Sequence, residues 1–327
     1  MKRREFISLI GGAAAMVPLV ARAQQPALPV VAVINSGAAE GQAARLAGFR
    51  KGLNATGYAE GQNATVEYHW LQGDYERLPA LLADLVRRRV SVMATLDTAS
   101  ALRAKNATTT IPIVFAVGED PVALGLVANL AQPGGNATGI NFFSLETNAK
   151  RLGLMHELLP KATRFGVLLN TASAAAAAAT SKTVKEAARA VGLETLFLNA
   201  STPSEIDAVF ATLAREPTDS LFIQGDGFFT SRAVQFATLA VRDRIPASYS
   251  AREMVEAGLL MSYGTNFADT WRQVGVYAGS ILKGAKPAEL PVLQSTRFEF
   301  VINLQTAKSV GIEVPPTLLA RADDVIE

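Results

Sequence analysis

The sequence predicts an α/β fold of two lobes, each built on a parallel sheet and joined by a multi-strand hinge. Short apolar runs such as Val30–Ile34 are hydrophobic on both faces, which is typical of strands in parallel sheets covered by helices. These runs alternate with helix-like patterns along the chain, and the alternation falls into two series of about 120 residues each. A chain of 327 residues is also longer than one hydrophobic core ordinarily supports. We therefore expect two lobes of similar architecture.

The first series supplies the elements of lobe 1. Its predicted strands are Val30–Ile34, Ala64–Tyr68, Val90–Leu96, Ile113–Val117 and Gly139–Phe142. Apolar residues at helical spacing predict the helices between them, which are marked by Leu46, Phe49 and Leu53, then by Leu78 to Val86, then by Ala99 to Asn106.

The second series supplies lobe 2 in the same way. Its predicted strands are Phe165–Leu169, Thr195–Leu198, Ser220–Ile223, Ile245–Ser248 and Leu259–Ser262. Helices are predicted over Leu145–Leu159, from Ser173 to Val191 with Gly192 as the C-cap, over Ile206–Leu213, and over Phe229–Asp243.

A further helix and a tail complete the chain. The helix is predicted over Phe267–Ile281, and the tail contains a strand over Phe298–Ile302 and a helix over Leu304–Val310. Because the tail folds onto lobes that are already complete, we expect chain crossings near Phe142, Ser262 and Pro291. The expected lobes are 28–141 plus 263–291 for lobe 1, and 142–262 plus 292–327 for lobe 2. Several crossings between two Rossmann-like lobes make a hinge with a cleft beside it.

The first 23 residues carry the pattern of an export signal. Lys2-Arg3-Arg4 precedes Phe6, an apolar run extends from Ser8 to Val20, and Ala21-Arg22-Ala23 fits a cleavage site. The paired arginines indicate the twin-arginine route. The apolar run is shorter than the about 20 residues needed to span a bilayer. We expect cleavage after Ala23 and a periplasmic mature protein, and a retained anchor is the alternative.

Composition and charge exclude several functional classes. Without residues 1–23 the chain has 27 basic and 28 acidic residues, so no nucleic-acid partner is expected. Cysteine is absent, and the two histidines, His69 and His156, stand far apart. A zinc site or a Ser-His-Asp triad therefore has little support, and we expect no metal and no cofactor.

Small polar residues gather where the predicted parallel strands end. In open α/β sheets, ligands sit beyond the carboxyl ends of the strands, where helix N-termini also meet. The candidate ligand-binding residues at these ends are Asn35, Ser36, Gly37, Asp97, Thr98, Ala99, Gly118, Asp120, Asn170, Thr171, Ser173 and Asp226. We expect the N–H groups of Ser36-Gly37 and Thr98-Ala99 to bind a carboxylate. The alternative for Ser36, Thr98 and Ser173 is helix capping alone.

Aromatic and acidic side chains beside these ends favour a small planar or charged ligand. Phe142, Phe228, Tyr249 and Tyr263 complete the candidate set, and packing between the lobes is the alternative for the phenylalanines. Asp97, Asp120 and Asp226 are candidate partners for an ammonium or hydroxyl group. Glu119 and Asp120 leave an exported hydrolase open as an alternative. Because the chain has no G-x-S-x-G motif, we expect no enzyme.

Sequence stretches along nearly the whole chain resemble one bacterial family. They include RREFI at 3–7, GYAEGQN at 57–63, TIPIVF at 110–115, PGGNATG at 133–139, MSYG at 261–264 and ARAD at 320–323. Taken together, they make the chain similar to the ABC-transporter substrate-binding proteins often labelled tryptophan/tyrosine transport components.

The resemblance implies a periplasmic solute-binding receptor with a type I periplasmic-binding-protein fold. It also implies hinge closure around one small-molecule ligand, docking on an inner-membrane ABC permease and its ATPase, and a monomer. Aromatic amino acids or related carboxylates are the first expected ligands. The family usually has an Asn-Pro-Asn-like loop after the strand ending at Asn170, whereas Thr171-Ala172-Ser173-Ala174 stands here, and Gly227 stands where Pro is frequent. A ligand-sensing subunit of a signalling receptor is the alternative role.

Overall fold

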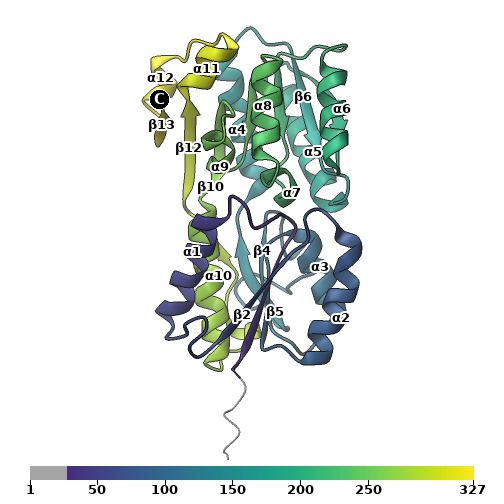
Figure 1. The fold of residues 1–327 in the computed structure, drawn as a ribbon, viewed down its shortest axis with the longest axis vertical. Helices are drawn as coiled ribbons and strands as arrows, with labels where there is room; N and C mark the ends of the chain where they lie inside the picture. The colour runs from purple at the N-terminus through teal and green to yellow at the C-terminus, as the bar shows by residue number, and fades with distance from the viewer. Residues whose placement is uncertain (1–27) are drawn as a thin grey trace, which may run out of the picture.

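The computed structural model describes residues 28–327, so the predicted export signal lies outside the described residues. The chain forms two lobes stacked along the long axis, each a twisted sheet with helices on both faces (Figure 1). The strand pairs are parallel except for one pair in lobe 2, as the continuous apolar runs predict. The predicted two-lobed α/β fold is confirmed.

The sheet of lobe 1 has the strand order β11-β5-β4-β3-β1-β2. Its strands are β1 (Val30–Asn35), β2 (Thr65–Trp70), β3 (Val92–Thr95), β4 (Ile113–Val117), β5 (Ala137–Asn141) and β11 (Leu293–Gln294). All of its strand pairs are parallel. The carboxyl ends of β1, β3, β4 and β5 therefore lie at the same edge of the sheet, where helix N-termini also gather.

Two helix layers cover this sheet. They consist of α1 (Ala43–Ala55) and α10 (Phe267–Leu282) on one face, and α2 (Leu78–Arg88) and α3 (Thr98–Ala107) on the other, with 3₁₀ turns at Tyr75–Arg77 and Pro287–Glu289. Val31 and Val33 of β1 pack under the first layer and Ala32 and Ile34 under the second, because successive side chains of a strand point to opposite faces. This two-sided burial explains the uninterrupted apolar run in the sequence.

The sheet of lobe 2 has the order β13-β12-β10-β9-β8-β6-β7. Its strands are β6 (Arg164–Leu169), β7 (Glu194–Asn199), β8 (Ser220–Ile223), β9 (Ala247–Tyr249), β10 (Met261–Thr265), β12 (Phe298–Asn303) and β13 (Asp324–Ile326). β12 runs antiparallel to β10, and the other pairs are parallel. The ends of β6, β8 and β9 therefore face the strand ends of lobe 1.

The helices of lobe 2 also form two layers. They are α4 (Ser144–Leu158), α5 (Ala174–Ala190), α11 (Leu304–Val310) and α12 (Pro316–Leu319) against one core, and α6 (Pro203–Leu213), α7 (Gly227–Thr230), α8 (Ala233–Arg242) and α9 (Arg252–Glu256) against the other. Local sequence sets some of their limits. Helix α6, for example, begins with a capping box in which the Thr202 hydroxyl accepts from the Glu205 N–H and the Glu205 carboxylate accepts from the Thr202 N–H.

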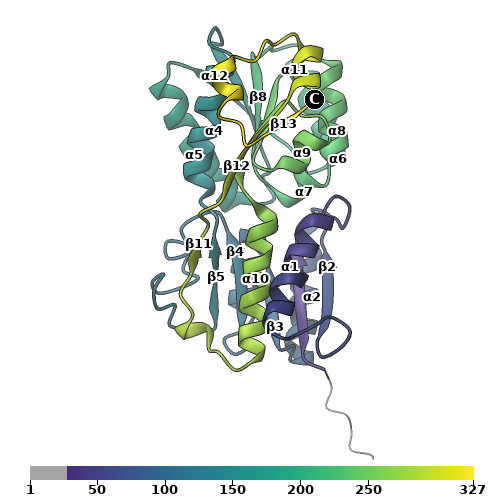
Figure 2. The same ribbon diagram turned by 90° about the vertical axis from the view of Figure 1, so that its left-hand side faces the viewer.

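The chain passes between the lobes three times, which makes the hinge. It crosses from β5 into α4, from β10 into α10, and from β11 into β12, and Figure 2 shows the last two crossings running side by side. The second crossing, expected near Ser262, follows Thr265, because β10 stays paired with β12 as far as Thr265 and Phe298. The third follows Gln294, since β11 pairs with β5 after Pro291. No helix within residues 28–327 is long and apolar enough to cross a bilayer.

Candidate functional site

A cavity lies between the lobes, at the carboxyl ends of both sets of strands. Of the predicted site residues, lobe 1 contributes Asn35, Asp97, Thr98 and Gly118 to its wall, and Phe142 comes from the first crossing between the lobes. Lobe 2 contributes Ser173, Asp226 and Tyr249. These eight residues come from seven different strand ends, so the folded chain brings together groups that lie far apart in the sequence.

Asp97 follows β3 and caps α3. Its carboxylate accepts from the backbone N–H and the hydroxyl of Ser100, each at 2.8 Å, and from the backbone N–H of Ser36 at 3.2 Å. Burial raises the pKa of Asp97 to about 6, and the nearby charge of Asp226 adds to the rise, while the hydrogen bonds from Ser100 oppose it. The side chain thus fixes the loop after β1 against α3 and presents a carboxyl group to the cavity.

Asp226 holds the corresponding place in lobe 2, after β8. Its Oδ1 accepts from the backbone N–H of Phe228 at 2.8 Å and of Phe229 at 3.3 Å, which caps α7, and from Asn170 Nδ2 at 2.9 Å. Burial raises its pKa above the ordinary value. Two carboxyl groups from opposite lobes therefore meet the same cavity, and each is costly to keep charged there. An ammonium group placed between them would offset that cost.

Tyr249 at the end of β9 holds the turn at Asp226 in place through hydrogen bonds to its backbone. Its hydroxyl donates to the Asp226 carbonyl at 2.6 Å, accepts from the Asp226 N–H at 2.9 Å, and lies 2.9 Å from the Thr230 hydroxyl. Burial raises the pKa of Tyr249 to about 12, so the phenol is neutral over the whole physiological range. The Tyr249 hydroxyl therefore has its partners within the protein.

The backbone N–H groups expected to bind a carboxylate divide into two kinds. Ser36 N–H donates to Asp97 and Gly37 N–H donates to Asn35 Oδ1 at 2.7 Å, so both already have intramolecular acceptors. Thr98 and Ala99 stand in the first turn of α3, ahead of the N–H that Asp97 caps, where helical N–H groups have no carbonyl partner within the helix. Of these four residues only Thr98 lines the cavity, and Ala99 packs against the core of lobe 1.

Ser36 and Gly37 meet the other lobe instead of the cavity. A Cβ atom added at Gly37 would lie 2.6 Å from the Gly227 carbonyl oxygen, and one added at Gly227 would lie 2.3 Å from Ser36 Oγ. Backbone therefore approaches backbone across the lobe boundary at this point, which only glycine allows. The two loops form a direct contact of the closed lobes.

Three further predicted polar residues stand outside the cavity wall. Asp120 is exposed and accepts from the Val122 N–H at 2.8 Å within its own loop. Thr171 is exposed, and Asn170 is buried behind Asp226. Glu119, by contrast, is buried, lines the cavity and accepts from the Thr98 hydroxyl. Glu119 and Asp120 thus point to different environments and do not form a carboxylate pair at one site.

Two of the predicted aromatic residues pack elsewhere. Phe228 is 1% exposed, and its ring lies 5.7 Å from that of Phe229 in the core of lobe 2. Its ring also faces lobe 1, where a Cβ added at Gly73 would lie 2.8 Å from it, so Phe228 packs between the lobes. Tyr263 stacks on Phe298 across β10 and β12, with ring centroids 6.4 Å apart. Phe142 alone of the predicted phenylalanines reaches the cavity, where it meets Phe267 edge to face at 5.2 Å.

Several cavity residues come from helix faces, which the strand-end reasoning does not cover. They are Arg45 on α1, Phe267 and Trp271 on α10, Asn148 on α4 and Thr180 on α5. Phe267 and Trp271 are four residues apart and so share one helix face. That spacing was visible in the sequence, but nothing in it shows that the first turns of α10 project past the sheet edge into the cleft. Among residues 28–327 no group of three or more His, Cys, Asp or Glu is arranged to hold a metal ion.

Comparisons with known proteins agree with this architecture. The tyrosine-binding protein of Clostridioides difficile (strain R20291) is 28% identical over 267 residues, which cover 81% of this chain and 76% of that protein. A crystal structure of an ABC domain in complex with L-Trp from Streptococcus pneumoniae superposes with a TM-score of 0.81 at 25% identity, covering 91% of this chain and 100% of the other.

A second crystal structure adds an open state for comparison. The ligand-free, open structure of a substrate-binding protein with adhesive properties from Clostridium difficile has a TM-score of 0.62 at 25% identity, covering 92% of this chain and 99% of that one. The family model for ABC transporter substrate binding proteins matches residues 30–326, nearly the whole of the described chain. The chain belongs to the ABC transporter substrate-binding protein family.

Proposed function

We propose that this receptor binds an aromatic amino acid between its lobes and delivers it to an ABC importer. The observation that carries the proposal is the cavity itself, which combines carboxyl groups from both lobes, Asp97 and Asp226, with the rings of Phe142, Phe267 and Trp271. An ammonium group suits the carboxyl groups and a planar ring suits the aromatic wall. The tyrosine-binding relative and the L-Trp complex support this class of ligand.

The arrangement of the lobes supports hinge closure as the mode of binding. The chain superposes better on the L-Trp complex than on the open, ligand-free protein, with TM-scores of 0.81 and 0.62 at the same 25% identity. The contact between Gly37 and Gly227 also requires the lobes to be together. In such a receptor the ligand stabilises the closed state to the extent that it binds that state better than the open one.

The proposed cellular setting follows from the N-terminal pattern and the family. We expect export by the twin-arginine route, a periplasmic monomer, and docking of the closed form on a permease with its ATPase. Export can be tested by fusing residues 1–27 to a reporter and replacing Arg3-Arg4 with Lys-Lys. Loss of export in the variant supports the twin-arginine route, and unchanged export contradicts it.

The ligand can be identified by its effect on stability. The mature chain is unfolded and refolded to remove co-purified ligand and then melted with L-tryptophan, L-tyrosine and L-phenylalanine, with L-leucine and L-glutamate as controls. A ligand at 100 times its dissociation constant adds about 2.7 kcal/mol, which moves the melting temperature of a protein of this size by several degrees. Mass spectrometry checks that the bound compound is recovered unchanged. No shift with any aromatic amino acid contradicts the proposed ligand class.

A further inference from the structure

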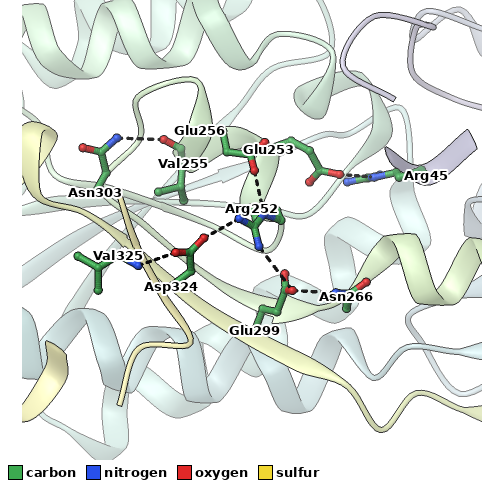
Figure 3. A network of polar contacts seen from close by, with 10 residues as sticks. All are labelled: Arg45, Arg252, Glu253, Val255, Glu256, Asn266, Glu299, Asn303, Asp324 and Val325. Carbon is green, nitrogen blue, oxygen red and sulfur yellow. Dashed lines mark hydrogen bonds and ion pairs between the residues drawn. The ribbon is translucent and has the colours of Figure 1, made fainter. Parts of the chain in front are cut away.

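One ion pair joins the two lobes beside the cavity. Arg45 in the first turn of α1 belongs to lobe 1, and Glu253 in α9 belongs to lobe 2. Arg45 Nε donates to Glu253 Oε1 at 2.7 Å, and the two side chains are only 6% and 17% exposed. Figure 3 shows the pair reaching across from separate segments of ribbon. Separation of the lobes at this side would break the pair and expose both charges to water.

The acceptor of this pair is held in place by its neighbours in lobe 2. Arg252, the residue before Glu253, bonds Asp324 of β13 at 2.7 Å and lies 3.6 Å from Glu299 of β12, while its Nε bonds Glu256 of the same helix (Figure 3). These contacts tie α9 to the two C-terminal strands. Glu253 is therefore presented to Arg45 from a fixed position.

The Arg45 guanidinium is part of the cavity wall. Its Cζ lies 4.5 Å from the centre of the Phe267 ring, and the residue lines the cavity. Its Nη2 is buried and has no hydrogen-bond partner among the described residues. A buried donor without an acceptor is costly, so a ligand that brings an acceptor to this nitrogen is favoured.

The charge pattern of the cavity wall makes that acceptor a carboxylate. Within the described chain, the acidic residues on the wall are Asp97, Glu119 and Asp226, and Arg45 is the basic one. A zwitterionic amino acid has its carboxylate and ammonium groups one carbon apart and needs a cationic partner for the first. Arginine suits this task, because its several N–H groups can serve two acceptors at once.

We propose that Arg45 binds the carboxylate of the ligand through Nη2 while Glu253, from the other lobe, holds its Nε. Glu253 is then a positioning residue, and recognition of the carboxylate is complete only when the lobes are closed. This assignment rests on the proposed function, since it takes the ligand to be an amino acid. It makes ligands without a carboxylate poor at closing the lobes.

The test compares each amino acid with its decarboxylated amine. Isothermal titration calorimetry measures the dissociation constants of L-tyrosine and tyramine, and of L-tryptophan and tryptamine, for the wild-type mature chain and for Arg45→Gln, Glu253→Gln and the double variant. Arg50→Gln is the matched control. Arg50 lies on the same helix, bonds Glu60 through Nε at the same 2.7 Å and sits over the Tyr68 ring, but its partner is in its own lobe.

The expected result is specific to the carboxylate. Arg45→Gln should weaken amino-acid binding by about 10- to 100-fold and leave amine binding within a few-fold, so the preference for the acid is lost. Glu253→Gln should weaken acid binding less, and its effect should vanish in the Arg45→Gln background. Arg50→Gln should behave as the wild type. If Arg45→Gln does not fold, Arg45→Lys replaces it, and its single ammonium should recover only part of the preference.

Two different outcomes separate the two proposals. If the wild type binds no aromatic amino acid, the proposed function fails. If the wild type binds one and Arg45→Gln keeps the preference for the acid over the amine, the role of Arg45 is overturned. The strongest rival is Gln224 on the lobe 2 side of the cavity, whose Nε2 is also buried and has no hydrogen-bond partner within residues 28–327. Loss of the preference in Gln224→Leu but not in Arg45→Gln would place the carboxylate there instead.

Discussion

Replacement of Gly37 by alanine should oppose closure without unfolding either lobe. The added Cβ would lie 2.6 Å from the Gly227 carbonyl oxygen and 3.2 Å from its carbon, both in the backbone of the other lobe. Its nearest neighbour in lobe 1 is Asn35 Oδ1 at 3.0 Å, the end of a side chain. The strain is therefore felt mainly when the lobes come together.

The size of the effect follows from these distances. Cβ contacts under 3.0 Å essentially do not occur in proteins, so the loops must separate by at least about 0.4 Å. Overpacking of this kind costs about 1–3 kcal/mol. If the ligand binds the closed state, its affinity should fall by about 5- to 150-fold. The melting temperature of the ligand-free variant should stay close to that of the wild type, because the open state has no clash.

Calorimetry of the amino acid identified in the melting panel gives the affinity, and small-angle X-ray scattering gives the radius of gyration with and without it. Gly153→Ala is the matched control, since a Cβ there meets nothing within 4 Å and the site lies inside helix α4. That control should bind normally and gain about 0.5–1 kcal/mol from helix propensity. If Gly37→Ala binds the ligand with wild-type affinity, and its radius of gyration with ligand equals that of the liganded wild type, the reasoning is refuted.

Three further predictions concern the walls of the cavity and the packing below it. Because the pKa of Asp97 is raised to about 6, its protonated form stabilises the fold below about pH 4, and this stabilisation is lost as the pH rises through 6. The melting temperature of Asp97→Asn should therefore depend less on pH than that of the wild type. Parallel curves of melting temperature against pH for the two proteins would contradict this. Tyr249→Phe removes both hydrogen bonds to the Asp226 backbone and should cost about 1–3 kcal/mol in urea unfolding, whereas a change under 0.5 kcal/mol would show that these hydrogen bonds are dispensable. Gly52→Ala places a Cβ 1.9 Å from the Arg272 carbonyl oxygen of α10, so it should lower the melting temperature by several degrees despite the higher helix propensity of alanine; an unchanged or higher melting temperature would disprove the close packing of α1 on α10.

Most of the fold could be predicted from the sequence, because buried parallel strands and amphipathic helices leave local patterns. The run Val30–Ile34 corresponds to β1 within one residue, and Leu304–Val310 coincides with α11. The strands that were not predicted are short and depend on distant partners. β11 has two residues and exists because it pairs with β5, and β13 exists because Asp324 to Ile326 pair with β12. No local pattern encodes such pairing.

The candidate site was predictable only where it follows strand ends. That rule brought Asp97 and Asp226 to one cavity, since parallel strands end at a common edge. It could not supply Arg45, because that residue lies on a helix, and its place in the cavity wall depends on the contact between α1 and α9 of the other lobe. It also could not show that Ser36 and Gly37 meet Gly227, because a local pattern does not describe the contact between closed lobes.

The sequence posed capping and ligand contact as alternatives for Ser36, Thr98 and Ser173, but two aspartates cap helices at this edge and line the cavity as well. Asp97 caps α3 and Asp226 caps α7, and both line the cavity. The cap fixes the rotamer of each side chain through hydrogen bonds from backbone N–H groups. A carboxyl group held in this way loses little conformational entropy when a ligand arrives. The same hydrogen bonds that start the helices therefore preorganise the acidic groups of the site, so that a substitution which weakens the cap should also weaken binding.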